Sequence, residues 1–201
     1  MLNNSIPKFE LKRLQVWKMK NPNKIQIDYK KPVSTDEVAN LLGMKYNKTL
    51  FDTNNNYDDE IKEFFNQVTG KDKLAFIIED KDGNVFGAYI NSTIYGSEYQ
   101  VFDINAFVFS LRSLGRYDEP KKFKIKEEYS HRAFSLKDKE DIYNMLFEVA
   151  DGEIRIFKNY KNKECKCYQN AFEYNDLKRV FIAKESGGDF KLERLQVWQM
   201  K

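Results

Sequence analysis

Residues 74–90 read L-A-F-I-I-E-D-K-D-G-N-V-F-G-A-Y-I, and this stretch decides the fold. Its first apolar run, residues 74–78, is typical of a buried strand because it is short and rich in branched and aromatic side chains. The pair Asp82-Gly83 follows, and Asp-Gly is favoured in the tight turns that join antiparallel strands. The second apolar run, residues 85–90, then returns as the partner strand. The stretch therefore predicts a buried β-hairpin.

Two short helices are indicated before this hairpin. Ser34 stands three residues before Glu37, which is the spacing of a capping box, and Gly43 closes the helix that follows. A second helix begins near Asp58 or Asp59 and carries one apolar stripe, formed by Ile61, Phe64, Phe65 and Val68.

Most other apolar segments are short and end at turn residues. They predict strands at residues 50–53, 99–102, 106–111, 143–149, 153–157, 179–183 and 190–201. Residues 158–170 are expected to form a loop, and Gly187-Gly188 a turn before the last strand. Many short strands with few helices predict a fold that is mainly β with α, a two-sheet antiparallel β-sandwich with two or three short helices.

The last predicted strand has a near copy at the other end of the chain. Residues 190–201 read F-K-L-E-R-L-Q-V-W-Q-M-K and residues 9–20 read F-E-L-K-R-L-Q-V-W-K-M-K, identical at nine of twelve positions. Apolar and polar residues alternate up to Glu193, and the phase of the pattern then slips at Arg194. A bulge at Arg194 explains the slip, and so does a strand that is buried on both faces.

The differences between the two copies suggest a role for the first one. Glu10 corresponds to Lys191 and Lys12 to Glu193, while Trp17 corresponds to Trp198. Parallel, in-register pairing of the copies would place opposite charges side by side at both positions, worth about 0.2–1 kcal/mol each. We expect the first copy to dock beside the closing strand, or to take its place in a neighbouring molecule as a swap that makes a homo-oligomer.

Length and composition favour one domain, or one domain with a short extension. The chain has 201 residues, of which 41% are hydrophobic and 15% aromatic, enough for a substantial core. The net charge is +3 with both signs interspersed, whereas nucleic-acid binders usually cluster their basic residues on one face. The densest basic stretch, Lys121 to Lys126, is therefore interpreted as a solvated strand or loop, and nucleic-acid binding is the weaker hypothesis.

The sequence predicts a cytoplasmic protein. No apolar run at the N-terminus has the form of a signal peptide, and none approaches the roughly 18 residues of a membrane-spanning helix. The two cysteines, Cys165 and Cys167, are too close together to close a useful disulfide loop. We expect free thiols in a reducing compartment.

Few residues point to catalysis or to ligand binding. The lone histidine, His131, has no nucleophile or carboxylate partner fixed by spacing, and one histidine with two cysteines falls short of a four-ligand zinc site. We predict no catalytic residues, no cofactor and no metal. The alternative is a redox or other enzyme activity, in which Cys165 and Cys167 would act as reactive thiols or scattered carboxylates would act as catalytic groups.

Five segments follow one another along the chain: T-L-F-D-T at 49–53, the hairpin with D-G-N-V-F-G-A-Y at 82–89, N-A-F-V-F-S-L at 105–111, the spacing of Cys165, Tyr168 and Asn170, and the ending F-x-L-x-x-L-Q-V-W. In this order they resemble the TLDc domain family. The motif residues are Asp82, Gly83, Phe86, Gly87, Phe107, Phe109 and Trp198. The resemblance covers about residues 45–201 and leaves residues 1–44 as an extension that holds the first copy and a short helix.

The resemblance implies a function as well as a fold. Proteins of the TLDc family protect against oxidative damage and bind the vacuolar-type proton-pumping ATPase. The chain is therefore expected to be a non-enzymatic protein-interaction module whose partners include subunits of that pump. Two features depart from the family: only Gly152 stands where the family often has a glycine-rich run, and residues 112–144 match no family motif.

Overall fold

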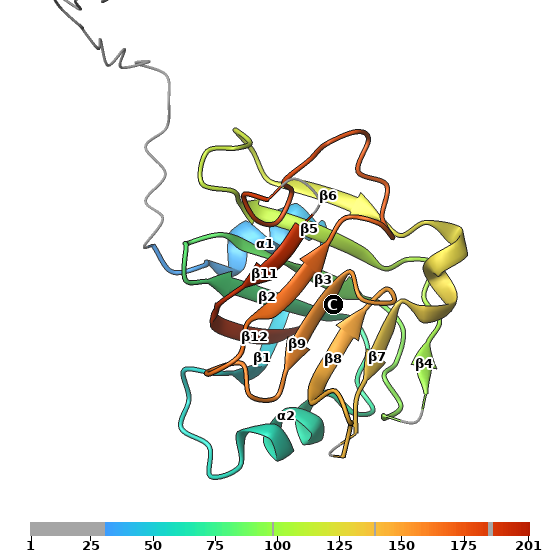
Figure 1. Ribbon diagram of the computed structural model, residues 1–201. Coiled ribbons are helices and arrows are strands. Elements are labelled where there is room, and N and C mark those ends of the chain that lie inside the picture. The colour runs from blue at the N-terminus through green and yellow to red at the C-terminus, as the bar shows by residue number, and fades with distance from the viewer. Residues whose placement is uncertain (1–30, 98, 139, 185–186) are drawn as a thin grey trace, which may run out of the picture.

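A computed structural model gives the fold and describes residues 31–97, 99–138, 140–184 and 187–201. Two antiparallel sheets of six strands each are found in these residues, so the predicted two-sheet sandwich is confirmed (Figure 1). Three short helices accompany the sheets: α1 (Thr35–Leu42), α2 (Glu60–Val68) and the 3-10 helix η1 (Glu127–Arg132).

The first sheet has the strand order β1-β12-β2-β3-β5-β6. Its strands are β1 (Tyr46–Asp52), β2 (Leu74–Asp80), β3 (Val85–Ile90), β5 (Phe107–Arg112), β6 (Lys121–Lys124) and β12 (Leu192–Met200). The predicted hairpin is β2 with β3, and it lies at the centre of this sheet. The closing strand β12 also lies inside the sheet, because it pairs with β1 on one edge and with β2 on the other.

The second sheet has the strand order β11-β10-β9-β8-β7-β4. Its strands are β4 (Gln100–Val101), β7 (Phe134–Leu136), β8 (Met145–Val149), β9 (Ile154–Phe157), β10 (Cys165–Tyr168) and β11 (Gly187–Phe190). The segment after β3 crosses to this sheet, forms β4 at its edge, and returns to the first sheet as β5.

Phenylalanine rings from both sheets fill the space between them. Phe76 of β2 stacks on Phe134 of β7 with ring centroids 4.9 Å apart, and Phe147 of β8 lies 5.1 Å from Phe76. Phe64 of α2 stacks on Phe147 at 5.6 Å, so α2 closes one end of the sandwich. Since burying one such side chain contributes about 1.5–3 kcal/mol, this cluster accounts for much of the attraction between the sheets.

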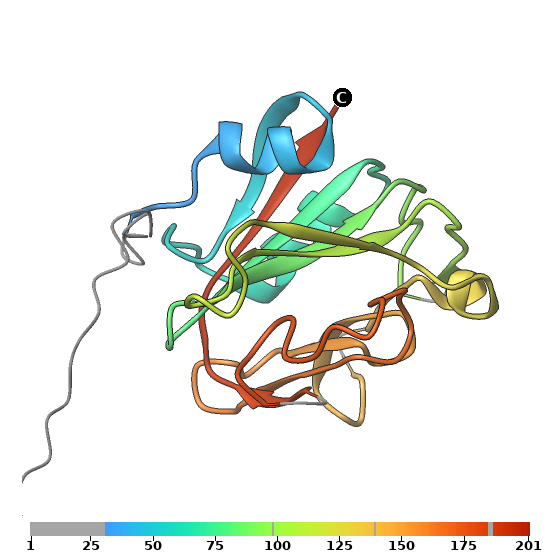
Figure 2. The ribbon, with the colours of Figure 1, turned by 90° about the horizontal axis from the view of Figure 1, so that it is seen from above.

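Helix α1 covers the outer face of the first sheet. The Ser34 hydroxyl accepts a hydrogen bond from the backbone N–H of Glu37, and the Glu37 carboxylate accepts one from that of Ser34, so the predicted capping box is confirmed. Val38 and Leu42 pack on sheet residues that point away from the second sheet, including Trp198. Figure 2 shows the resulting layers: α1, the first sheet and the second sheet.

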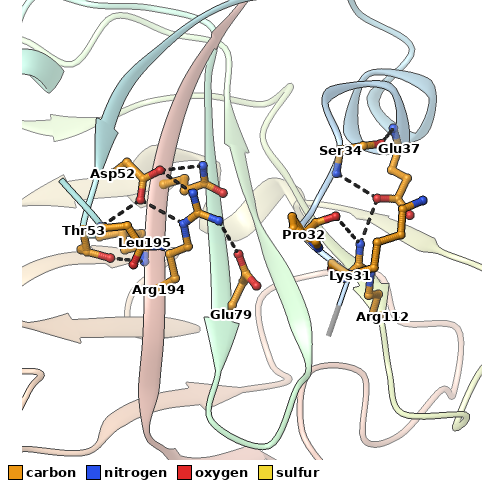
Figure 3. A network of polar contacts seen from close by, with 12 residues as sticks. Lys31, Pro32, Ser34, Glu37, Asp52, Thr53, Glu79, Arg112, Arg194 and Leu195 are labelled. Carbon is orange, nitrogen blue, oxygen red and sulfur yellow. Dashed lines mark hydrogen bonds and ion pairs between the residues drawn. The ribbon is translucent and has the colours of Figure 1, made fainter. Parts of the chain in front are cut away.

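Two arginines form ion pairs on the first sheet, one between its strands and one to helix α1 (Figure 3). Arg194 of β12 donates to both carboxylate oxygens of Asp52 at 3.0 and 2.6 Å, and it also reaches Glu79 at 3.5 Å, so it ties β1, β12 and β2 together. Arg112 of β5 donates to the Glu37 carboxylate at 3.0 Å and thereby holds the first turn of α1.

Both explanations of the phase slip in the closing strand are confirmed. The pairing of β12 with β2 shifts between Leu192 and Arg194, which is the predicted irregularity. Beyond it, Leu195 and Val197 join the core between the sheets, whereas Trp198 lies under α1 in the other cluster. The strand is thus bulged and also buried on both faces.

Three local predictions are wrong. The predicted turn at Gly187-Gly188 is part of strand β11, and the predicted loop at 158–170 contains strand β10. Residues 179–183 form no strand, although Val180 and Phe181 are fully buried. Their backbone bonds to side chains instead: Gln169 accepts from the Val180 N–H, and Arg116 donates to the Phe181 carbonyl at 2.9 Å.

The first copy of the closing strand, with Glu10, Lys12 and Trp17, lies outside the described residues. The division of the chain after residue 44 stays a prediction. Within the described part of the predicted extension, α1 packs directly on the first sheet.

Candidate protein-interaction surface

Large apolar side chains are exposed on two loops at one edge of the second sheet. The loop between β3 and β5 exposes Tyr95 (73%), Tyr99 (60%), Phe102 (62%) and Ile104 (47%), and the loop between β7 and β8 exposes Ile142 (86%) and Tyr143 (64%). We call these six residues the edge surface. The two loops are neighbours, because β4 pairs with β7 at this edge.

Buried and exposed side chains follow one another at the end of β4. Val101 of β4 and Asp103, just beyond the strand, are 5% and 2% exposed, whereas Phe102 and Ile104 are largely exposed. The backbone of Val101 is held by its pairing with Phe134 of β7. Among the described strands, β4 pairs with β7 alone, which leaves its other edge unpaired. The apolar side chains therefore flank an open sheet edge.

A buried carboxylate fixes the loop that carries four of the six residues. Asp103 accepts hydrogen bonds from the backbone N–H groups of Asn91 at 2.5 Å and Ser92 at 3.0 Å, where the loop begins. It also accepts one from the N–H of Asn105 at 2.9 Å, where the loop ends. The loop is thus closed at its base, so its exposed aromatic residues are presented by a fixed frame.

We expect Asp103→Ala to loosen this loop without unfolding the domain. The change removes three accepted hydrogen bonds and leaves the half-buried N–H groups of Asn91 and Ser92 unpaired, where a fully buried group would cost about 1–3 kcal/mol. Chymotrypsin should then cleave after Tyr99 and Phe102 about tenfold faster or more, because local opening becomes easier. Asp82→Ala, which changes an exposed aspartate in another loop, is the control and should leave the cleavage rate unchanged. Equal rates for both variants would contradict the role given to Asp103.

A shallow groove lies where the two loops meet helix α2. Ile61 and Phe65 supply its apolar lining from α2, while Ser97 and Asp138 come from the two loops. Ile61 and Phe65 are half-buried and pack on the main core. The two loops that carry the edge surface therefore also contribute residues to a groove with an apolar lining, and exposed apolar patches of this kind are typical of surfaces that bind other proteins.

The family-motif residues of the hairpin shape its turn and its packing. Asp82 and Gly83 form the turn between β2 and β3, and Gly83 has φ +94°, a conformation that favours glycine. Phe86 points between the sheets and meets the ring of Phe190 edge-on at 5.2 Å. Gly87 lies where the backbones come close, because a Cβ there would lie 1.9 Å from the Phe76 carbonyl oxygen.

The remaining motif residues lie on the outer side of the first sheet. Phe107 stacks on Tyr89 with ring centroids 4.9 Å apart, and Phe109 is fully buried in the same cluster. Trp198 meets Tyr46 edge-on at 5.4 Å. The sequence motifs therefore mark the core of the domain, and the candidate interaction surface is built from other residues.

Cys165 and Cys167 are free thiols on strand β10 and are fully buried. Burial raises the pKa of the Cys165 thiol to about 11 and that of the Cys167 thiol to about 12. A thiol must ionise to act as a nucleophile, so both positions disfavour rapid redox chemistry. The redox hypothesis stays a prediction that labelling can test.

We expect neither cysteine to react with a thiol reagent at pH 8 while the protein is folded. The thiolate fraction at that pH is below about one in a hundred for each residue, and neither side chain is open to solvent. Ellman's reagent should give two equivalents in denaturant and none within minutes under native conditions. Rapid native labelling would instead support the redox hypothesis.

The lysine-rich stretch is engaged in separate local contacts. Lys121 pairs with Glu119 at 2.7 Å, and Lys122 lies over the Phe107 ring at 4.9 Å from its centroid. Lys126 donates to the Asn170 carbonyl at 2.6 Å. These lysines lie on or beside edge strand β6, where charged side chains prevent further strand pairing. The interpretation as a solvated strand is confirmed.

The described residues also include His131 and other side chains of the kinds that can bind a metal ion. His131 lies exposed in η1. Within the described ranges, no group of three or more His, Cys, Asp and Glu side chains is arranged to hold a metal ion. The same residues contain no helix that is long and apolar enough to cross a membrane.

Lys191 and Glu193, where the two copies carry opposite charges, are both exposed. The predicted docking of the first copy beside β12 meets an obstacle, because β1 and β2 occupy both edges of that strand. The parallel pairing of Glu10 with Lys191 and of Lys12 with Glu193 therefore has no free edge to use.

Sequence reasoning did not find the edge surface. Residues 99–102 were predicted only as a short strand, which is where β4 lies. The alternation of Val101 and Asp103 with Phe102 and Ile104 is visible in the sequence, but its phase would ordinarily place the large apolar residues inside. The signal in the sequence is Asp103: when this aspartate is buried, the apolar residues next to it, Phe102 and Ile104, are left exposed.

The fold and the edge surface define a two-sheet β-sandwich module that exposes aromatic side chains beside an open sheet edge. The sequence model of the TLDc domain matches residues 43–201. This match covers most of the chain, and the protein therefore belongs to the TLDc domain family, as the sequence motifs predicted. No curated protein matches the chain.

Proposed function

We propose that this chain is a non-enzymatic protein-interaction module of the cytoplasm. In this proposal it binds a subunit of the vacuolar-type proton-pumping ATPase and contributes to protection against oxidative damage. Membership of the TLDc family supports the general assignment. The observation that carries the proposal is the edge surface, where six large apolar side chains are between 47% and 86% exposed.

The chemistry of the edge surface suits a protein partner. Tyrosine and phenylalanine provide large contact areas with few rotatable bonds, and aromatic residues dominate the energetic centres of protein interfaces. Tyr99 and Phe102 flank β4, so a partner could contact both rings and also use the unpaired strand edge. The groove beside α2, lined by Ile61 and Phe65, would accept an apolar side chain of the partner.

The reactive side chains of the described residues support a role without catalysis. Both thiols are buried with raised pKa values, and His131 is exposed on η1. The buried carboxylate of Glu153 accepts hydrogen bonds from the backbone N–H groups of Asn170 and Ala171 and from the hydroxyl of Tyr174, which is a structural use. We therefore assign the two thiols and Glu153 to the stability of the fold.

Binding to purified pump tests the proposal. The peripheral sector of the ATPase is immobilised, and the full chain is titrated over it at physiological salt. We expect saturable binding by wild type and a loss of about 100-fold or more for Tyr99→Ser/Phe102→Ser, because two central aromatic residues are removed. Lys48→Ala, an exposed change on β1 of the other sheet, is the control and should bind like wild type. Failure of wild type to bind any pump subunit contradicts the proposal.

The protective role is tested separately in cells that lack the protein. Wild-type chain should restore growth in peroxide, and Tyr99→Ser/Phe102→Ser should not, provided that both accumulate to the same level. Full rescue by a Cys165→Ser/Cys167→Ser variant would support protection through binding. If the cysteine variant fails and the surface variant succeeds, the redox alternative is the better explanation.

A further inference from the structure

The position of β12 between β1 and β2, which we call the slot, places specific demands on the strand that fills it. Strand β12 lies between β1 and β2, so its backbone is hydrogen-bonded on both edges, and it faces the two hydrophobic cores at once. Its burial pattern is irregular because of the bulge at Arg194. In residues 190–201 seven side chains are buried: Phe190, Leu192, Leu195, Gln196, Val197, Trp198 and Met200. An unrelated strand would not satisfy this pattern.

The N-terminal copy keeps every one of these buried residues. Phe9 corresponds to Phe190 and Trp17 to Trp198, and the seven buried positions are all among the nine identities. The copies differ at Lys191, Glu193 and Gln199. Lys191 and Glu193 are exposed, and Gln199 is only half-buried. The differences thus fall only where the slot tolerates any polar side chain.

The copy also keeps the polar contacts that are particular to the slot. Arg194 binds both oxygens of Asp52, and the Gln196 side chain donates to the same carboxylate at 3.1 Å. Arg13 and Gln15 stand at these two positions in the copy. Arginine and glutamine do not by themselves favour a buried strand. In this strand they provide the hydrogen-bond donors that the buried carboxylate of Asp52 needs.

The chain has the length to place the copy in its own slot. The last residue of the slot, Lys201, exchanges two backbone hydrogen bonds of 2.9 Å with Lys45, just after α1 (Figure 2). The start of α1 is about 12 Å further away, since the helix has eight residues. Residues 21–34 would connect the copy to α1, and an extended segment of that length spans up to about 46 Å.

We propose that residues 9–20 are a second closing strand, which exchanges with β12 in the slot between β1 and β2 of the same chain. The direction of the strand is the same in both states, so Lys20 would lie beside Lys45 where Lys201 lies now. A tethered segment competes at an effective concentration of the order of millimolar, well above that of a second molecule. Exchange would release residues 190–201, with their apolar side chains, as a free segment.

Disulfide trapping in the full chain tests the exchange. Lys48 of β1 is the register partner of Gln199, and Lys18 is the residue of the copy that corresponds to Gln199. Lys48→Cys/Gln199→Cys should cross-link when β12 is in the slot, and Lys48→Cys/Lys18→Cys when the copy is. The native cysteines are buried and do not compete. We expect both pairs to give a cross-linked product of monomer mass on a non-reducing gel.

Two further substitutions show whether the cross-link reports the slot. Arg194→Ala weakens β12 alone and should raise the yield from the Lys18→Cys pair about tenfold, because an arginine–carboxylate contact is lost from only one competitor. Arg13→Ala should lower the yield from that pair. The proposal is overturned if the Lys18→Cys pair gives no product or only a product of dimer mass. It is also overturned if neither arginine substitution changes the yield from this pair.

Discussion

Gly87→Ala is expected to prevent stable folding. A Cβ at this position would lie 1.9 Å from the carbonyl oxygen of Phe76 and 2.7 Å from the ring of Phe109. The first atom belongs to the backbone of β2, so relief requires the central hairpin to separate. Such overlap should cost more than about 4 kcal/mol, a large part of the total stability of about 5–15 kcal/mol.

The measurement is thermal unfolding by circular dichroism, together with the soluble yield. We expect little soluble Gly87→Ala protein and no cooperative transition from it. The matched control is Gly70→Ala, because Gly70 has φ +74° but nothing within 4 Å of the added atom. That variant should stay folded and lose only about 1 kcal/mol to backbone strain. Equal melting temperatures for the two variants would contradict the close approach of β2 and β3.

Asp52→Ala is expected to lower the melting temperature by about 6–12 °C. Asp52 is 8% exposed, accepts two hydrogen bonds from Arg194 and is also bound by Gln196. Removing one partner of such a buried pair costs about 3 kcal/mol, and 1 kcal/mol shifts the transition by about 2–4 °C in a protein of this size. The change affects either closing strand, since Arg13 would need the same carboxylate.

The pH dependence of this contact has a defined sign. Burial by itself raises the pKa of Asp52, but the hydrogen bond from Arg194 and the N–H of Asn54 outweigh it, so the pKa lies below its ordinary value of 3.8. The contribution is therefore complete above the unfolded pKa and is lost as the pH falls through the lower folded value. The difference in melting temperature between wild type and Asp52→Asn should shrink from pH 7 towards pH 3. A difference that grows in acid would contradict the ion pair.

Local signals with a strong physical cause predicted much of the fold. The Asp82-Gly83 turn, the capping box of Ser34 and the stripe on α2 each depend on neighbouring residues alone, and all three lie where the sequence placed them. The slip at Arg194 was visible because a bulge changes the alternation of buried side chains. These features need no knowledge of distant contacts.

The wrong predictions depend on distant contacts. The apolar run after Arg179 resembles a strand, but its carbonyl groups are satisfied by Arg116, about sixty residues away, so it fills the core without joining a sheet. Gly187 lies inside β11 because the Cys167 carbonyl comes so close that a Cβ would lie 2.1 Å from it. Glycine here permits strand approach, whereas its usual local meaning is a turn.

The candidate surface was harder to predict than the fold. Family motifs pointed to Phe86, Gly87 and Trp198, which lie in the core, since sequence resemblance mostly reflects packing. The edge surface depends on Asp103 pointing inward and on the partner of β4, and both follow from the crossing between the two sheets. Residues 112–144, which match no motif, supply β6, η1 and β7, including the strand that holds β4.

Hydrogen exchange with and without the purified peripheral sector of the vacuolar-type ATPase tests the central claim most directly. The claim is that the edge surface is where the partner binds. Saturating partner should slow amide exchange in peptides that contain Tyr99, Phe102 or Tyr143, while peptides from α1 and β1 on the far side keep their rates. Protection confined to α1 and β1, or no protection anywhere at saturation, would contradict the claim.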